Sequence, residues 1–338
     1  MNSNKTKELA RLRLSDGTII DPLIEKILTR RNITGQKAVR AFLHPKLQDL
    51  PTPFQMKDME IAVTVLEEGI KRDVPILIIG DYDVDGTTAT ALLMLFFREI
   101  GCTANYYIPN RLSEGYGLHE ESLRKLAAGK EKTEKILITV DNGIGAHGAV
   151  RLAGELGYHT IVTDHHTPPD TRVPADAVLN PKQEDRNFTD KNLAGVGVAF
   201  YLAMGLRSHL SKVGFFRERR GTPNLKSLMD LVAVGTVADM VPLSGINRTL
   251  VKAGMETLAL KTNYGLTELC KQTSIDCSYI RSEDISFQLA PKINAAGRLG
   301  KADRAVGLFL AQSKTEASEI ASELIRNNER RKNINIFD

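Results

Sequence analysis

The sequence predicts an α/β fold in which helices cover both faces of a parallel sheet, and the order of apolar and helix-forming segments leads to this prediction. From about residue 56 to residue 180, short apolar segments alternate with longer helix-forming segments, which is the pattern of βαβ units. The composition, with 42% hydrophobic and 25% charged residues, is ordinary for a soluble globular enzyme. We also expect an N-terminal helical segment and a long helix near the C-terminal end.

The elements follow in order from hydrophobic periodicity and turn residues. Residues 1–50 are predicted to be helical and connective, and Pro51-Thr52-Pro53 marks a break. Helices are then predicted at 61–71, 87–100, 119–128 and 146–156, and strands at 74–79, 104–108, 135–140, 159–163 and 177–179. Helices should dominate 197–239, residues 241–287 should be mixed, and 302–331 is strongly helix-forming. We therefore expect an N-terminal segment 1–50, a catalytic domain 51–300 and a connector helix within 301–338.

Three acidic residues alternate where an expected strand meets the next helix. Asp81, Asp83 and Asp85 follow strand 74–79 and precede helix 87–100. Like charges this close repel, and burying an unpaired one costs several kcal/mol. A cation is the usual remedy, and oxygen ligands favour Mg²⁺ or Mn²⁺. The alternative is an acidic loop that only caps the helix, and the rest of the chain argues against it.

Two further strand ends carry similar side chains. Strand 135–140 ends in Asp141-Asn142-Gly143, and strand 159–163 ends in Asp164-His165-His166. The carboxyl ends of parallel strands line one edge of a sheet, where ligands bind, so these motifs should converge. Asp239 closes an apolar helical stretch and adds a fourth acidic position. A single strand-end Asp is usually a helix cap, but this combination predicts a site for two divalent metal ions.

These motifs resemble, in order, the four motifs of the DHH phosphoesterase superfamily. They are Asp81-Tyr82-Asp83-Val84-Asp85-Gly86, Asp141-Asn142-Gly143, Asp164-His165-His166 and Gly235-Thr236-Val237-Ala238-Asp239. The first motif begins with Asp rather than His and resembles the RecJ branch, the single-strand-specific exonucleases. The similarity continues through Ser113-Glu114-Gly115-Tyr116-Gly117, Gly195-Val196-Gly197-Val198-Ala199 and Ala290-Pro291-Lys292-Ile293-Asn294-Ala295-Ala296-Gly297-Arg298. It covers the chain from about Pro22 to its end.

The resemblance implies a role for each metal-site residue. One ion would be held by Asp81, Asp83 and Asp141, and the other by Asp85, Asp141, His165 and Asp239. Asp141 would bridge the ions because its strand lies between the others, and the mixed oxygen and nitrogen set favours Mn²⁺ over Mg²⁺. Asp164 would orient the histidines from behind. His166 would contact the scissile phosphate, with a structural histidine as the alternative.

Other residues are candidates for contacts with the nucleic acid. Arg111 and Arg298 could grip phosphates, and Ser113 and Asn294 are further polar candidates in the same segments. Tyr116 could stack on a base or could equally be a packed loop aromatic. Within residues 195–197, the two glycines are interpreted as allowing close helix packing beside the site.

Composition excludes several classes of protein. The three cysteines, Cys102, Cys270 and Cys277, form no Cys-x-x-Cys pair, which argues against zinc and disulfides and for a reducing compartment. The polar N-terminus has no apolar segment typical of a secretory signal, and no apolar run approaches the roughly 18 residues of a membrane span. We therefore expect a cytoplasmic protein without a membrane partner. The net charge of +4 is mild, and the local basic clusters are interpreted as ordinary solvated surface in preference to nucleic-acid contacts.

The resemblance implies metal-dependent hydrolysis of single-stranded DNA from the 5′ end in repair and recombination, with a single-strand-binding protein or a helicase as candidate partners. A phosphodiesterase for short oligonucleotides or cyclic dinucleotides is the alternative, and its His-type first motif is absent here. A non-catalytic binding module of the same fold is a third reading, although every ligand position is filled. Rossmann-type dinucleotide binding is disfavoured because an acidic first turn would repel a pyrophosphate. In the family, the C-terminal helix leads to a DHHA1-type domain, for which this sequence has no room.

Overall fold

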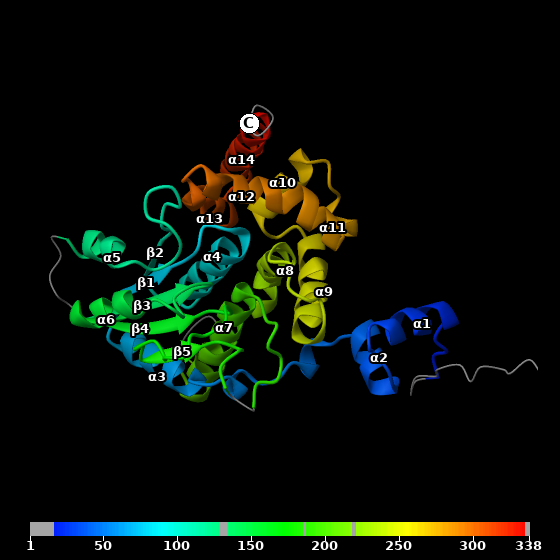
Figure 1. Cartoon of the computed structure of the whole chain (residues 1–338), viewed down its shortest axis with the longest axis horizontal. Helices are drawn as coiled ribbons and strands as arrows, with labels where there is room; N and C mark the ends of the chain where they lie inside the picture. The colour runs from blue at the N-terminus through cyan, green and yellow to red at the C-terminus, as the bar shows by residue number, and fades with distance from the viewer. Residues whose placement is uncertain (1–16, 129–133, 185–186, 218–220, 335–338) are drawn as a thin grey trace, which may run out of the picture. The chain divides into compact units, whose positions relative to one another are not determined.

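The computed structural model describes residues 17–128, 134–184, 187–217 and 221–334 (Figure 1). Its contacts divide the chain into two compact units, and the boundary in the sequence lies between Leu50 and Pro51. The first unit contains α1 (Pro22–Arg30), α2 (Gln36–Leu43) and the short helix η1 (Leu47–Asp49). Asp21 caps α1 by accepting a hydrogen bond from the Leu23 amide. The helices enclose a small core of Ile20, Leu28 and Val39.

The second unit is built on a five-stranded parallel sheet, which confirms the predicted fold class (Figure 1). Its strands are β1 (Ile76–Ile79), β2 (Ala104–Tyr107), β3 (Lys135–Val140), β4 (Tyr158–Thr163) and β5 (Ala177–Leu179), in the order β2-β1-β3-β4-β5. Because every neighbouring pair is parallel, all five carboxyl ends lie at the same edge. The strands β1, β3 and β4, which precede the three predicted motifs, are adjacent.

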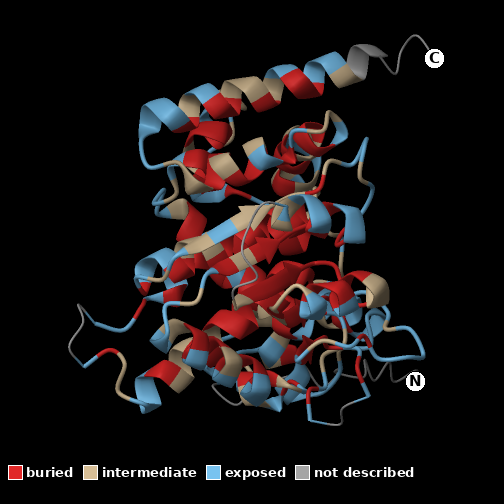
Figure 2. Ribbon diagram, turned by 90° about the vertical axis from the view of Figure 1, so that its left-hand side faces the viewer, coloured by how far each residue is buried: buried red, intermediate tan, exposed pale blue. Residues whose placement is uncertain are grey.

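Alternate residues of each strand face opposite layers of helices. Leu137 and Val162 belong to a core formed with α5 (Glu120–Ala127) and α6 (His147–Glu155). On the other face, Gly69 brings its helix so close to Ile136 that a Cβ would lie 2.3 Å from that side chain. This layer contains α3 (Met59–Lys71), α4 (Val84–Glu99) and α7 (Gly195–Lys212). Figure 2 shows the buried residues concentrated in the sheet and in the helix faces that cover it.

Helices complete the second unit after α7. They are η3 (Leu225–Leu228), α8 (Met229–Ala238), α9 (Gly245–Ala259), α10 (Tyr264–Gln272), η4 (Cys277–Tyr279), α11 (Ser282–Asp284), η5 (Ile285–Leu289, a π-helix), α12 (Ala290–Arg298), α13 (Ala302–Leu310) and α14 (Lys314–Ile334); the short η2 (Pro53–Gln55) precedes α3. Residues 241–287, all of which the structure describes, contain no strand, so the expected mixed character is wrong. The caps of Asn263 and Asp276 start helices there.

The long C-terminal helix is confirmed as α14, but it begins later than predicted (Figure 1). Ser313 Oγ accepts a hydrogen bond from the Glu316 amide, and Glu316 accepts one from the Gln312 amide. These hydrogen bonds stabilise the start of α14. The helix α4 begins three residues earlier than predicted, because the Asp83 side chain caps it by accepting from the Gly86 amide at 2.9 Å.

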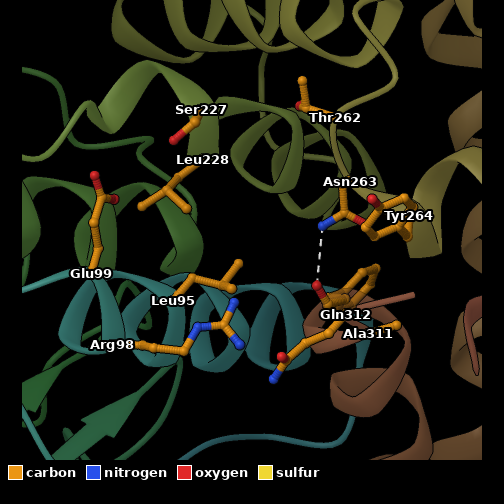
Figure 3. A pocket seen from close by; sticks show the side chains of 11 residues that line it. Leu95, Arg98, Glu99, Ser227, Leu228, Thr262, Asn263, Tyr264, Ala311 and Gln312 are labelled. Atoms are coloured by element: carbon orange, nitrogen blue, oxygen red, sulfur yellow. Dashed lines mark hydrogen bonds between the residues drawn. The ribbon is translucent and has the colours of Figure 1, made fainter. Parts of the chain in front are cut away.

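No helix in the described part of the chain is long and apolar enough to cross a membrane. A surface pocket of about 500 Å³ lies beside the C-terminal half of α4 (Figure 3). Leu95 and Arg98 line it, and across it the Asn263 side-chain amide donates to the Phe309 carbonyl at 3.1 Å. Asp85, a predicted metal ligand, lies near the other end of this helix, about 15 Å from Leu95 and about 20 Å from Arg98 along the axis. The pocket is therefore separate from the predicted site.

Candidate metal centre

The three predicted motifs converge at the carboxyl edge of the sheet. Asp81 lies two residues after β1, Asp141 directly follows β3 and Asp164 directly follows β4. The pairing of Thr139 with Ile79 and of Val140 with Thr163 brings these ends level. The helix α8 ends at the same place, where Asp239 is its C-terminal cap residue.

The side chains form groups with the spacing of metal ligands. Asp81, Asp83 and Asp141 each offer a ligand atom, and these atoms lie within 4.8 Å of one another. The same spacing is found in the groups Asp85–His165–Asp239 and Asp141–His165–His166. The first group contains all three residues of the first predicted ligand set. The second contains three of the four residues of the other set; Asp141, the fourth, lies 3.1 Å from His165 Nε2. The third group shows that His166 also has the position of a possible ligand.

Four buried ligand atoms in this cluster have no hydrogen-bond partner in the described structure. They are Asp81 Oδ1, Asp141 Oδ1, His165 Nε2 and Asp239 Oδ2. Buried polar atoms are nearly always paired, because leaving one unpaired costs about 1–3 kcal/mol, and more for a charged group. Their convergence is therefore best explained by cations that the donor set fits.

The carboxylates are electrostatically unstable without such a cation. Burial, followed by the charge of Asp83, raises the pKa of Asp81 to about 7. Burial raises the pKa of Asp239 to about 6, with a further contribution from Asp83. The pKa of Asp141 is raised well above its ordinary value by burial and then by the charge of Asp85. A divalent ion would reverse these shifts because it stabilises the ionised forms.

His165 is placed to act as a neutral nitrogen ligand. Its Nε2 lies 3.1 Å from Asp141 Oδ1, 3.7 Å from Asp239 Oδ2 and 3.9 Å from Asp85 Oδ2. Burial lowers the pKa of His165 although the neighbouring carboxylates oppose the change. A metal ligand must be unprotonated, so this environment favours the binding form.

Asp85 is held by the N-terminus of α7, a contact that the sequence did not predict. Its two carboxylate oxygens accept hydrogen bonds from the amides of Gly195 and Val196, both at 2.7 Å. A Cβ on Gly195 would lie 2.6 Å from Asp141 Oδ1, so only glycine allows this approach. The Gly-x-Gly segment therefore does more than permit helix packing. The signal available in the sequence was a helix N-terminus, which binds carboxylates.

Asp164 contacts both histidines, and its role in orienting them stays a prediction. Its Oδ1 accepts from the amides of His165 and His166 and lies 2.7 Å from His166 Nδ1, while Oδ2 accepts from the Ile144 amide. Burial would raise the pKa of Asp164, but the hydrogen bonds from His166 and Ile144 lower it. The hydrogen bond between the Asp164 and His166 side chains raises the pKa of His166.

Of the predicted substrate contacts, Arg111 and Arg298 lie beside the first motif. Arg111 stacks over the ring of Tyr82 with its Cζ 4.8 Å from the ring centroid, and Arg298 also acts on Tyr82 electrostatically. Ser113 is exposed on the loop that carries Arg111. Asn294 Oδ1 accepts from the Val84 amide at 3.1 Å, so it ties α12 to the first motif.

A residue that sequence reasoning missed is Lys182. It is exposed, and its charge acts on His165, His166 and Asp239. Asn180 connects this segment to the site because its side-chain amide donates to the His166 carbonyl at 2.9 Å. The available signal was position, since Asn180-Pro181-Lys182 directly follows β5 at the same sheet edge.

Known proteins share this sequence and fold. The DHH family, N-terminal domain, matches residues 75–236. The single-stranded-DNA-specific exonuclease RecJ of Escherichia coli K12 is 40% identical over 93% of this chain and 54% of its own length. The chain thus spans about half the length of the curated relatives it matches.

Solved structures agree with this relationship. The crystal structure of exonuclease RecJ bound to manganese matches with a TM-score of 0.73 and 36% identity, over 82% of this chain and 67% of that one. RecJ of Thermus thermophilus in complex with Mn²⁺ matches with a TM-score of 0.73 and 31% identity, over 96% of this chain and 46% of that one. The chain therefore belongs to the DHH family and, within it, to the RecJ group.

Proposed function

We propose that the chain hydrolyses phosphodiester bonds in single-stranded DNA, releasing nucleotides from the 5′ end, in DNA repair and recombination. The main support for this proposal is that four buried ligand atoms without hydrogen-bond partners in the described structure converge at the sheet edge. Membership of the RecJ group supports single-stranded DNA as the substrate. The three cysteines are free, which is consistent with action in the cytoplasm. A single-strand-binding protein or a helicase stays a candidate partner.

Two divalent ions, Mn²⁺ in preference to Mg²⁺, would be held by the predicted ligands. Asp81, Asp83 and Asp141 form the all-oxygen set, and Asp85, Asp239 and His165 form the mixed set. When bound, the ions supply an activated water and neutralise charge on the phosphoryl and leaving oxygens. Crystal structures of RecJ from Thermus thermophilus in complex with Mn²⁺ and with Mg²⁺ support divalent ions in general, and the preference for Mn²⁺ rests on the mixed donor set.

The protein's own groups position the substrate. His166 is held at Nδ1 by Asp164, which leaves Nε2 as the ring atom that can contact the scissile phosphate. A pocket of about 300 Å³ opens beside it, lined in part by Gly143 and Ile144. The exposed cations Arg111 and Arg298, both of which act on Tyr82, would bind neighbouring phosphates bidentately.

Strands labelled at either end test this proposal directly. With Mn²⁺, a 5′ label should appear first in the shortest product, whereas a 3′ label should move through progressively shorter strands. Chelation should abolish both patterns, and Ca²⁺ should restore them poorly because it prefers more ligands and a looser geometry. Cleavage restricted to dinucleotides or cyclic dinucleotides would favour the alternative substrate class, and full activity in chelator would refute the metal mechanism.

Asp141→Asn tests the proposed bridging role of Asp141, and Asp170→Asn, at an exposed position, is the control. The amide keeps the shape of the side chain but cannot bridge two cations, so turnover should fall to a few per cent or less. The metal-free variant should also melt higher than the wild type, because a buried charge with a strongly raised pKa is removed. Retention of more than a few per cent of the wild-type rate would contradict the bridging role.

A further inference from the structure

Tyr116 presents its hydroxyl, rather than its ring face, to the metal centre. It lies between Gly115 and Gly117, both with positive φ, in the connection from β2 to α5. The hydroxyl lies 2.7 Å from the backbone carbonyl oxygen of Asp141 and 3.3 Å from Nδ1 of His166. That Nδ1 proton is directed at Asp164, since a carboxylate can only accept. The Tyr116 proton is therefore donated to the Asp141 carbonyl.

The accepting peptide group belongs to a residue in a demanding conformation. Asp141 has φ 61°, in the left-handed region that residues with a side chain seldom occupy. Such a conformation persists only when the surroundings enforce it. On one side the Asp141 amide donates to the Thr163 carbonyl at 3.0 Å. On the other side the Tyr116 hydroxyl holds the carbonyl, so the direction of the Asp141 carboxylate depends on both contacts.

The loop that carries Tyr116 is anchored independently of the metal ligands. Glu114 accepts hydrogen bonds from the Tyr107 hydroxyl, the Asn110 amide and the Ser122 hydroxyl at 2.6–3.1 Å. The Asn110 side chain also donates to the Gly300 carbonyl at 3.3 Å. These contacts fix the loop, so the Tyr116 hydroxyl can hold the Asp141 carbonyl in place.

The same loop reaches the candidate substrate contacts. Arg111 stacks over Tyr82, and the Tyr82 and Tyr116 rings meet nearly at right angles with centroids 6.3 Å apart. The Tyr116 ring also meets His166 nearly at right angles, with centroids 5.8 Å apart. Tyr116 thus lies between a cation that would bind phosphate and the carboxylate that would bridge the ions.

We propose that Tyr116 is a positioning residue whose hydroxyl fixes the Asp141 backbone and thereby the geometry of the bridging carboxylate. Base stacking by the ring is not its main role. The kinetic part of this inference rests on the proposed nuclease function, whereas the metal-binding part does not.

Tyr116→Phe tests the inference because it removes the hydroxyl and keeps the ring contacts. Tyr279→Phe is the matched control, since Tyr279 is 83% exposed and lies on η4. Calorimetric titration with Mn²⁺ alone should show affinity lowered about 3- to 10-fold in Tyr116→Phe, the factor expected for one lost hydrogen bond. With single-stranded DNA, kcat should fall by a similar factor while KM stays within about 2-fold. Glu114→Gln, which loosens the loop without touching Asp141, should weaken Mn²⁺ binding in the same direction.

The opposite results are equally clear. Unchanged Mn²⁺ affinity in Tyr116→Phe would overturn the inference, and so would an effect confined to KM, which marks a substrate contact. If Tyr116→Ala alone raised KM while Tyr116→Phe behaved as wild type, the ring would be a stacking residue. Weaker Mn²⁺ binding by Tyr116→Phe in a chain that cleaves no DNA would remove the proposed function and keep this inference.

Discussion

Two adjacent histidines at the end of β4 have different surroundings, and single atoms account for the difference. His165 Nε2 is buried among three carboxylates and has no hydrogen-bond donor or acceptor in good geometry within the described structure. His166 is about half-exposed and has its Nδ1 held by Asp164. Their rings are nevertheless in contact, with centroids 4.6 Å apart. Their roles as ligand and as phosphate contact stay predictions, with which these surroundings are consistent.

Alanine substitutions should separate these roles. His165→Ala should raise the Mn²⁺ requirement and lower metal occupancy in calorimetry, because a nitrogen ligand is lost. His166→Ala should leave occupancy near that of the wild type and lower the catalytic rate by about 10²- to 10³-fold, the loss typical of removing one group that stabilises developing charge. His44→Ala, an exposed histidine of the first unit, serves as control. Equal loss of metal in both variants would make His166 a ligand, as its spacing in the group with Asp141 permits.

At the scale of elements, the N-terminus of α7 is part of the metal centre. Its first two amides bind the Asp85 carboxylate, which orients Asp85 and places the positive end of the helix against a cluster of acids. The helix can approach only because Gly195 has no side chain. A secondary-structure element therefore stabilises the charge that the metal ions would otherwise neutralise alone.

Gly195→Ala should disrupt the centre, since its Cβ would lie 2.6–2.9 Å from three atoms of the Asp141 side chain. We expect loss of Mn²⁺ binding and at least about 10-fold lower activity, measured by calorimetry and single-strand cleavage. Gly154→Ala is the matched control because it lies in α6 and its Cβ would have open space. That control should gain up to about 1 kcal/mol of stability from helix propensity. Normal metal binding in Gly195→Ala would show that α7 can shift without consequence.

At the scale of the whole molecule, the buried acids link stability to pH and metal. The folded pKa of Asp81 is about 7 and that of Asp239 about 6, both above the ordinary value of 3.8. The folded state therefore holds protons that the unfolded state has released. The stability due to this proton binding is complete below about pH 3.8 and is lost as pH rises through 6 to 7.

Metal-free protein should consequently melt at a lower temperature at pH 8 than at pH 5.5. Asp81 alone accounts for about 2 kcal/mol over this range, or several degrees in Tm. Saturating Mn²⁺ should reverse the trend, because it binds the ionised carboxylates of the folded state. Asp81→Asn should flatten the metal-free profile when followed by differential scanning calorimetry. A metal-free Tm that is higher at pH 8 than at pH 5.5 would mean that these carboxylates are not destabilised by burial.

The sequence alone determined the fold class and the location of the site. Strands β3 and β5 have the predicted bounds, and the predicted ligands meet at the sheet edge. These features depend on local periodicity and on the rule that parallel strands end at one edge, so they can be read from a single chain. The helical nature of residues 241–287 could not be predicted from the sequence, because their apolar pattern is short and is interrupted by turns.

Only the tertiary structure decided how the ligands are held. The α7 amides on Asp85, the Tyr116 hydroxyl on the Asp141 carbonyl and the Asn294 side chain on the Val84 amide join positions 110, 25 and 210 residues apart. Such contacts arise from packing between elements and leave no local pattern in the sequence. The sequence therefore specifies which side chains can bind metal, whereas long-range packing decides which of their atoms remain free to do so.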